Sequence, residues 1–484
     1  MKPSIIGIGR LALVSGLAAG VVLASQQVAS EVSLTRWDHG LSSAPGEQSS
    51  APTTSARTCP GPELMGVKGA PDAAQQVHVL AARAPGSVFP DDPGEGGQLT
   101  LTAGGSTSQV EGLSANADVS TPTPVMVQAT DGHAPGLAAS QWWSSEIKDL
   151  RGLVTTVCPD EGDDLWLIAG GGAPGRQERL VLANSGANEV TVDVTVHGLK
   201  GAIAAPNGRG IVVPGRGRTV ILLDAIAGGE ASPAVHVAVR GGTVSAVLSD
   251  VWLDGSVAAG ADASTPIIPA SRQVMPGVPL SQPGVLRVAV PGAVQAVVSV
   301  RVVTADGTAP LPGGGVVMVP AGSTVDVQLA DLPPATYAVE AVSDVPIVAA
   351  AFSQIRIDAA PGDFAWTVAA PAIQGVAGTP LGDLPAASTR TLVLTSTAGS
   401  SEAEVWSGDP SAQPRSVSVG PDRMLTVDIP ATAGSVWVRR LGGDGELRAA
   451  VVNSSGEGGA RLVSVMTLTD TVTVTVRSNV VPLP

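Results

Sequence analysis

Four dipeptides that end in proline mark this chain at nearly regular intervals. They are Cys59-Pro60, Cys158-Pro159, Ile268-Pro269 and Ala370-Pro371, and their prolines lie 99, 110 and 102 residues apart. Each one follows an apolar segment and opens a new stretch of strand-like runs. A repeat of about one domain length predicts tandem modules, each with its own small core, rather than one large enzyme core.

Shorter segments repeat inside these modules. The alternating run at 180–182 returns at 286–288 and again at 392–394, and each is typical of a strand. The stretch 58–159 shares only a late strand and the flanking prolines with the others. We therefore interpret it as a degenerate copy of the module.

The composition predicts an all-β fold of tandem immunoglobulin-like sandwiches. Valine, threonine and alanine dominate, and the 59 glycines and 39 prolines fall at the ends of strand-like runs. Such runs recur at the spacing of about 8–12 residues that is typical of sandwiches. Aromatic residues are only 2% of the chain, so the cores must be aliphatic. The predicted modules are 58–159, 160–269, 270–371 and 372–484.

The N-terminus predicts export. Lys2 and Arg10 precede an uncharged apolar run at 11–24, which is typical of a signal peptide or a signal-anchor. We expect one apolar helix within residues 1–30, and residues 31–57 read as a flexible linker rich in Ser, Ala, Pro, Gly and Thr. The protein is then either secreted or anchored to the cell membrane by this single helix. The linker favours anchoring.

Cysteine usage agrees with export. Cys59 and Cys158 are the only two cysteines, and they bracket the first module. In an oxidising compartment we expect them to form a disulfide between neighbouring strands. The alternative is two free thiols.

Charge and motifs exclude several functions. The net charge is −15 and the chain has only four lysines, which leaves no basic patch for nucleic acid. Residues 170–175 fit G-x-G-x-x-G, but a strand pattern rather than a helix follows, so we interpret them as a β-hairpin loop. We find no pattern for catalytic residues, a cofactor or a metal, and we predict a protein that is not an enzyme.

Trp142 and Trp143 are the one candidate ligand contact. Adjacent residues on a strand face opposite sides, so one of these indoles is expected to point outward, where it can stack on a sugar or a partner side chain. The alternative places one indole in the core and the other against a loop or a neighbouring module.

Several short motifs of this sequence resemble those of a protein family. The Cys59-Pro60-Gly61-Pro62 opening, the Gly-Leu-Ala-Ala segment at 136–139 and Asp164-Leu165-Trp166 before three glycines resemble a family of exported actinobacterial proteins. That family is catalogued only as a domain of unknown function. The similarity extends over roughly residues 58–470. It implies one N-terminal membrane segment and an extracytoplasmic β-rich region, and it implies no catalytic residues.

Together these features predict a non-enzymatic extracytoplasmic protein of the cell envelope, built as a tandem β-sandwich scaffold. It would act by structural spacing or by interaction with envelope proteins or cell-wall glycan. The alternative is an envelope protein that binds carbohydrate or processes polysaccharide.

Overall fold

Alternation of apolar and polar residues produces strands along almost the whole described chain. The computed structural model describes residues 33–37 and 47–479, with gaps at 69–71, 74, 90–92, 95, 111, 204, 313 and 409–412. Strands make up 60% of the structure and helix 4%, which confirms the all-β prediction. The helix expected within residues 1–30 lies outside the described residues. Within the described ranges, no helix has the length and apolarity needed to cross a membrane.

The strands fall into four consecutive sets of two antiparallel sheets each. We call the sheet that holds the last strand of a set its inner sheet and the other its outer sheet. In the first set the outer sheet has the order β3-β8-β5-β6 and the inner sheet β7-β4-β9-β10. Its strands are β3 (Thr54–Cys59), β4 (Val77–Arg83), β5 (Leu99–Ala103), β6 (Ser106–Val110), β7 (Ser114–Val119), β8 (Val125–Thr130), β9 (Leu137–Ile147) and β10 (Leu150–Val157).

The second set repeats this order. Its outer sheet is β11-β17-β13-β14, with β15 also paired to β13, and its inner sheet is β16-β12-β18-β19. A short helix, α2 (Asp224–Ala227), follows β16. The strands are β11 (Asp164–Ile168), β12 (Arg176–Asn184), β13 (Val190–Gly198), β14 (Gly201–Ile203), β15 (Ile211–Val213), β16 (Gly217–Leu222), β17 (Ala234–Arg240), β18 (Ser245–Asp254) and β19 (Val257–Ser264).

In the third set one long strand, β26 (Ala335–Ile355), belongs to both sheets. Its first part pairs with β20 and β22, and its second part pairs with β21 and β27. The outer order is therefore β20-β26-β22-β23 and the inner order β25-β21-β26-β27. The other strands are β20 (Ala270–Leu280), β21 (Gly284–Ala289), β22 (Ala296–Thr304), β23 (Gly307–Pro310), β24 (Val316–Val319), which also pairs with β22, β25 (Thr324–Leu329) and β27 (Asp363–Val368).

The fourth set has the outer order β28-β33-β30-β31 and the inner order β32-β29-β34-β35. All four sets thus share one strand order, including the first, which the sequence had indicated to be a degenerate copy. The strands are β28 (Val376–Pro380), β29 (Ser388–Thr397), β30 (Ser401–Ser407), β31 (Arg415–Val419), β32 (Arg423–Ile429), β33 (Ser435–Gly442), β34 (Glu446–Ser455) and β35 (Leu462–Thr467).

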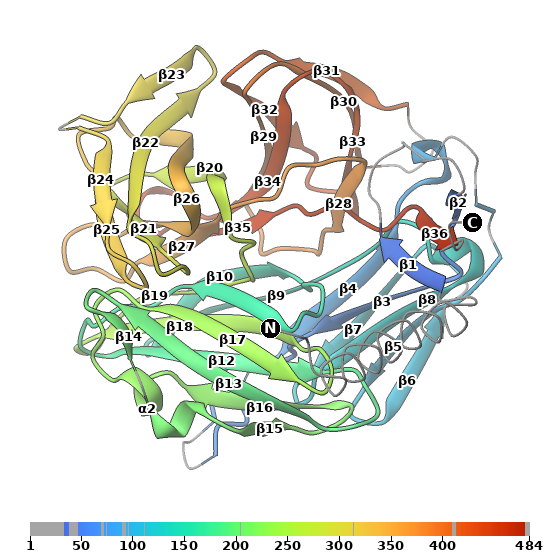
Figure 1. Ribbon diagram of the computed structural model, residues 1–484, viewed down its shortest axis with the longest axis horizontal. Helices are drawn as coiled ribbons and strands as arrows, with labels where there is room; N and C mark the ends of the chain where they lie inside the picture. The colour runs from blue at the N-terminus through green and yellow to red at the C-terminus, as the bar shows by residue number, and fades with distance from the viewer. Residues whose placement is uncertain are drawn as a thin grey trace, which may run out of the picture.

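The four sets close into a ring around a common centre (Figure 1). The last strand of each inner sheet lies at this centre, and we call β10, β19, β27 and β35 the hub strands. Each hub strand contacts the next, and β35 contacts β10. The repeat therefore builds one closed body and not an extended row.

A small additional sheet joins the two ends of the described chain. β36 (Thr475–Asn479) pairs with β1 (Ser33–Trp37) and β2 (Glu47–Ser50), one on each side. Parts of the segment 31–57, predicted as a flexible linker, are therefore strand. Its composition offers few apolar side chains, but β36 supplies backbone partners from the far end of the sequence, which local composition does not reveal.

The hydrophobic core is less divided than the repeat predicted. One continuous cluster of buried residues runs from Leu165 to Ala369 and spans the second and third sets. The cluster of the first set also includes Val247 and Ala261 of the second set, whereas another centres on the fourth set and takes in Val157 of the first. The expectation of independent cores is thus wrong, because apolar faces of neighbouring sets pack directly against each other.

The predicted disulfide between Cys59 and Cys158 is confirmed. Cys59 ends β3, an edge strand of the outer sheet, and Cys158 directly follows β10, an edge strand of the inner sheet. The bridge therefore joins the two sheets of the first set, and not neighbouring strands of one sheet as expected.

Candidate binding groove

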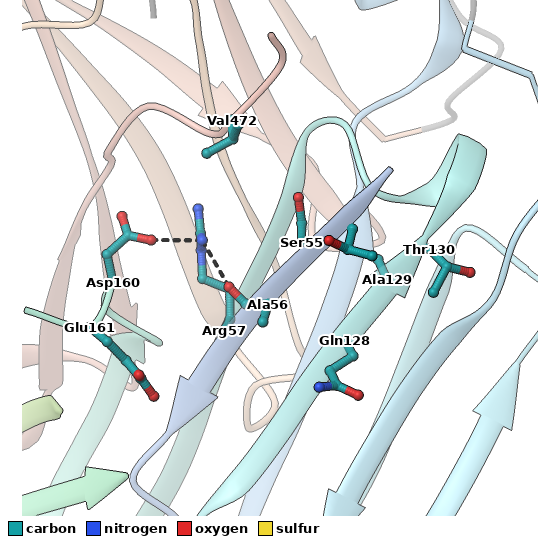
Figure 2. Close-up of a pocket in the computed structure, with 10 residues that line it drawn as sticks. Ser55, Ala56, Arg57, Gln128, Ala129, Thr130, Asp160, Glu161 and Val472 are labelled. Carbon is teal, nitrogen blue, oxygen red and sulfur yellow. Dashed lines mark hydrogen bonds and ion pairs between the residues drawn. The ribbon is translucent and has the colours of Figure 1, made fainter. Parts of the chain in front are cut away.

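A groove of about 730 Å³ opens along β3, where the first set meets the start of the second. Figure 2 shows β3 with the side chains of β8 on one side and the acidic residues that precede β11 on the other. The lining residues are Thr54, Ser55, Ala56 and Arg57 of β3, Gln128, Ala129 and Thr130 of β8, Asp160, Glu161 and Val472.

The backbone of β3 presents hydrogen-bonding groups to this groove. The N–H of Asp131 donates to the carbonyl of Thr53, and the register pairs Thr54 with Thr130. In an antiparallel pair, alternate residues bond to the partner strand and the others point away from it. The N–H and C=O groups of Thr54 and Ala56 therefore face away from β8, and both residues are exposed.

Two contacts agree with this register. The carbonyl of Ala56 accepts a hydrogen bond from Arg57 Nη1 at 3.0 Å, and the carbonyl of Thr58 accepts one from Ser245 Oγ at 2.9 Å. Both carbonyls point away from β8. The second set thus closes the edge of β3 at Thr58, and the edge stays open at Thr54 and Ala56.

The charges at the groove are asymmetric. Arg57 Nη1 lies 2.6 Å from Asp160 Oδ1, but the Arg57 side chain is 9% exposed and that of Asp160 is 62% exposed. Glu161 accepts hydrogen bonds from Thr58 Oγ1 at 2.9 Å and from Thr243 Oγ1 at 3.0 Å. The mouth of the groove consequently presents a carboxylate, whereas the guanidinium is held inside.

The disulfide holds both walls of the groove. Arg57 lies two residues before Cys59 and Asp160 lies two residues after Cys158. The covalent bond between the cysteines therefore limits how far the two walls can separate. Sequence reasoning missed this site because Thr54 to Arg57 fell within the predicted linker. Residues 54–58 show no alternation of apolar and polar residues, and the two threonines close to Cys59 are the one weak signal for a strand.

The tryptophan pair lies elsewhere, on β9. Trp143 is buried in the core of the first set, and its Nε1 donates to Glu63 Oε2 at 3.0 Å. Trp142 is half-buried and stacks on His78 with ring centroids 4.4 Å apart. Gly382 of the fourth set lies so close to the Trp142 indole that a side chain at this position would collide with it. The structure does not bring these residues together with the groove.

The amino-acid sequence of this chain matches a known family. The profile of DUF5719, a family of unknown function, matches residues 113–430. The chain belongs to this family. No curated protein matches the chain. The match to DUF5719 includes the Gln128 and Asp160 walls of the groove but not β3.

In this DUF5719 protein the glycine-rich loop at 170–175 binds internal carboxylates. The N–H of Gly170 donates to Asp250 Oδ2 at 3.1 Å, and the N–H of Gly171 donates to Glu178 Oε1 at 2.8 Å. The loop connects β11 to β12, which lie in different sheets, so the β-hairpin interpretation is wrong. Burial, and then the charge of Asp250, raise the pKa of Glu178 to about 7.

A buried ion pair continues this cluster toward the third set. Arg176 Nε donates to Asp250 Oδ1 at 2.8 Å, and Trp366 Nε1 donates to Asp250 Oδ2 at 2.8 Å. The side chain of Asp250 is fully buried. Arg176, Asp250 and Trp366 thus hydrogen-bond to one another inside the protein. The cluster joins the second and third sets and leaves none of these three side chains available to a substrate.

Two further carboxyl groups lie among the hub strands. Asp262 on β19 accepts the N–H of Trp366 at 2.6 Å and the hydroxyl of Ser464 at 3.1 Å. The Ser464 hydroxyl in turn accepts the N–H of Thr155 at 3.0 Å. Burial raises the pKa of Asp262 well above its ordinary value, and the charge of Asp363 adds to this effect. These carboxyl groups tie β19 to β27, β35 and β10.

Metal binding finds no support in the part of the chain that the structure describes. Within it, no group of three or more His, Cys, Asp or Glu side chains is placed to hold a metal ion. The groove beside β3, with about 730 Å³ and exposed side chains along it, is our candidate site for contact with another molecule.

Proposed function

We propose that this protein is a non-enzymatic extracytoplasmic component of the cell envelope, and that it acts as a scaffold that binds a protein partner in the groove beside β3. The observation that carries this proposal is the open edge of β3, where Thr54 and Ala56 present backbone groups to a groove of about 730 Å³. The buried carboxyl clusters serve the junctions between sets and suggest no reaction.

The closed ring favours interaction over spacing. In an extended array each module adds length, but here four sets share one centre. Tandem immunoglobulin-like sandwiches remain our proposal for the units. In the second set β12 lies beside β16 and β13 beside β17, as the second and fifth and the third and sixth strands do in immunoglobulin domains. Two strands differ from that order: β11, the first strand, pairs with β17, and β18 pairs with β12 instead of β17.

Two features support the proposed location. The disulfide is typical of oxidising compartments, and the sequence predicts an export helix within residues 1–30. We propose that the ring lies outside the cytoplasmic membrane, either released or held by that helix.

A photo-crosslinking experiment tests the function. A photoreactive residue replaces Gln128, an exposed side chain in the groove, in the full-length chain in its native envelope. Gln109 on β6 is the matched control, because it is an exposed glutamine at the opposite edge of the same sheet. We expect a protein adduct from position 128 and none from 109. Equal adducts at both positions, or none at 128, would contradict the proposal.

Carbohydrate binding is the second candidate, and one observation favours it. Asp160 and Glu161 place two carboxylates in a groove between two sets, and acidic side chains are common at sites that bind or hydrolyse glycans. Their engagement by Arg57 and Thr58 weighs against catalysis. A polysaccharide adduct at position 128, in place of a protein adduct, would favour this candidate.

A further inference from the structure

We propose that the partner is held by strand addition: an extended peptide segment that carries a lysine or arginine pairs with β3 at Thr54 and Ala56. This inference rests on the proposed function and adds how the partner is bound and which side-chain chemistry is selected. The backbone of an added strand supplies affinity, and the residues beside it supply specificity.

The open edge can accept a short strand. The N–H and C=O groups of Thr54 and the N–H of Ala56 point into the groove, and no partner for them lies among the described residues. Arg57 Nη1 donates a hydrogen bond to the carbonyl oxygen of Ala56. An N–H of the incoming peptide can replace this donor. The Ser245 hydroxyl donates a hydrogen bond to the carbonyl oxygen of Thr58, so the added strand must end before it reaches Thr58.

The side-chain preference follows from charge. The Asp160 carboxylate is 62% exposed at the mouth of the groove, whereas its partner Arg57 is 9% exposed. The whole chain carries a net charge of −15, which favours the approach of a cationic segment and disfavours an anionic one. A cationic side chain that lies beside Asp160 gains attraction without displacing Arg57.

The same charge argues against a second copy of this chain as the occupant. Two copies joined at their β3 edges would bring the exposed Asp160 side chains and two net charges of −15 toward each other. A dimer that dissociates when Ala56 is replaced by proline would therefore overturn the assignment of the occupant.

The test uses the full-length chain with its disulfide intact and three capped synthetic peptides as probes. One alternates valine and lysine, the second alternates valine and glutamate, and the third is the lysine peptide with N-methyl groups on alternate residues. We expect the lysine peptide to bind and to slow hydrogen exchange in the segment 53–57. The glutamate and N-methylated peptides are expected to bind at least about tenfold more weakly, because charge pairing and backbone donors are lost.

Two pairs of variants locate the contacts. Ala56→Pro removes the N–H that faces the groove and spares the bonds to β8, a position where an edge strand tolerates proline. It should weaken binding of the lysine peptide by about threefold to tenfold, the effect of one hydrogen bond. Ala56→Thr keeps the N–H and should bind as the unmodified chain does. Asp160→Asn should reduce the preference for lysine over glutamate, whereas Asp306→Asn, at an exposed turn outside the groove, should not.

Failure of this inference is distinguishable from failure of the proposed function. If the lysine peptide does not bind, or binds Ala56→Pro as tightly as the unmodified chain, strand addition is wrong. A protein adduct from position 128 would in that case still support partner binding in the groove. Unchanged melting temperatures of the variants ensure that any loss of binding is not a loss of fold.

Discussion

The carboxyl group of Asp363 on β27 accepts a hydrogen bond from the backbone N–H of Val463 on β35, with 2.9 Å between Oδ2 and N. The same carboxyl group accepts the N–H of Leu153 on β10 at 3.1 Å and the N–H of Ala261 on β19 at 3.2 Å. One side chain thus binds the main chain of the three other hub strands. The carboxyl group of Asp363 therefore links all four hub strands at the centre of the ring.

Replacement of Asp363 should destabilise the whole ring. Asp363→Ala leaves three buried N–H groups without an acceptor, and each unsatisfied group costs about 1–3 kcal/mol. We expect a loss of roughly 3–9 kcal/mol in the free energy of unfolding, measured by urea titration. Asp306→Ala, at an exposed turn, is the control and should change stability by less than about 0.5 kcal/mol. Equal effects of the two substitutions would contradict the role of Asp363.

Stability should fall as pH rises from about 4.5 to about 8. Burial raises the pKa of Asp363 to about 8 and that of Glu178 to about 7. In the unfolded chain both carboxyl groups lose their protons near pH 4. Between that pH and the raised folded pKa of each group, only the folded protein keeps the proton bound. Each group then lowers the free energy of unfolding by up to about 1.4 kcal/mol per pH unit. Urea titrations across this range measure the slope.

The Glu178→Gln variant provides the control for this pH dependence. It should reduce the steepness of the slope between pH 4.5 and 7 by up to about 1.4 kcal/mol per pH unit. The slope that remains comes from Asp363, Asp262 and Glu63, whose pKa values burial also raises. Stability that instead increases over the whole range would show that these carboxyl groups are ionised in the folded protein.

Loss of the disulfide should loosen the groove before the rest of the ring. The bridge closes a loop with a sequence separation of 99, and the Cys59→Ala/Cys158→Ala variant should lose up to about 4–5 kcal/mol on the chain-entropy account. Hydrogen exchange should accelerate in β3 and β10, which the cysteines join, and should remain slow in the fourth set. Uniform acceleration in all four sets would mean that the bridge supports the ring as a whole.

The buried ion pair between Arg176 and Asp250 should be costly to break. Arg176→Met leaves the fully buried Asp250 carboxylate without its counter-charge, and we expect a loss of about 3–5 kcal/mol. Arg240→Met is the matched control, because Arg240 is 66% exposed in its pair with Asp193 and should cost less than about 1 kcal/mol. Thermal unfolding measures both losses of stability.

The surroundings of Arg176 add to its burial. Its guanidinium carbon lies within 6 Å of the centres of the aromatic rings of Trp252, Phe352, Phe364 and Trp366.

The two neighbouring tryptophans should respond differently to substitution. Trp143→Phe removes the donor to the buried Glu63 carboxyl group and should cost about 1–3 kcal/mol. Trp142→Phe keeps an aromatic ring on His78 and should cost less than about 1 kcal/mol. Retention of each variant on immobilised cell-wall glycan tests the predicted ligand contact: a loss confined to Trp142→Phe would support it, and unchanged retention of both would remove it.

The repeat in the sequence predicted the strands because strand formation depends on local alternation. Residues 180–182, 286–288 and 392–394 do occupy equivalent strands, β12, β21 and β29. The first set was harder to recognise because its strand order, and not its residues, is shared. Cys59 and Cys158 could be paired in advance because a chain with two cysteines in an oxidising compartment has one possible bridge.

The sequence by itself determined the all-β class, the four-fold repeat and the disulfide, since each depends on residue type and spacing along the chain. Only the tertiary structure decided that the repeats form a ring, that Trp143 points inward to Glu63, and that β3 leaves an open edge beside Asp160. These features depend on which strand edges meet in space. The Asp363–Val463 contact joins residues 100 positions apart, and no local pattern of hydrophobicity specifies such a pairing.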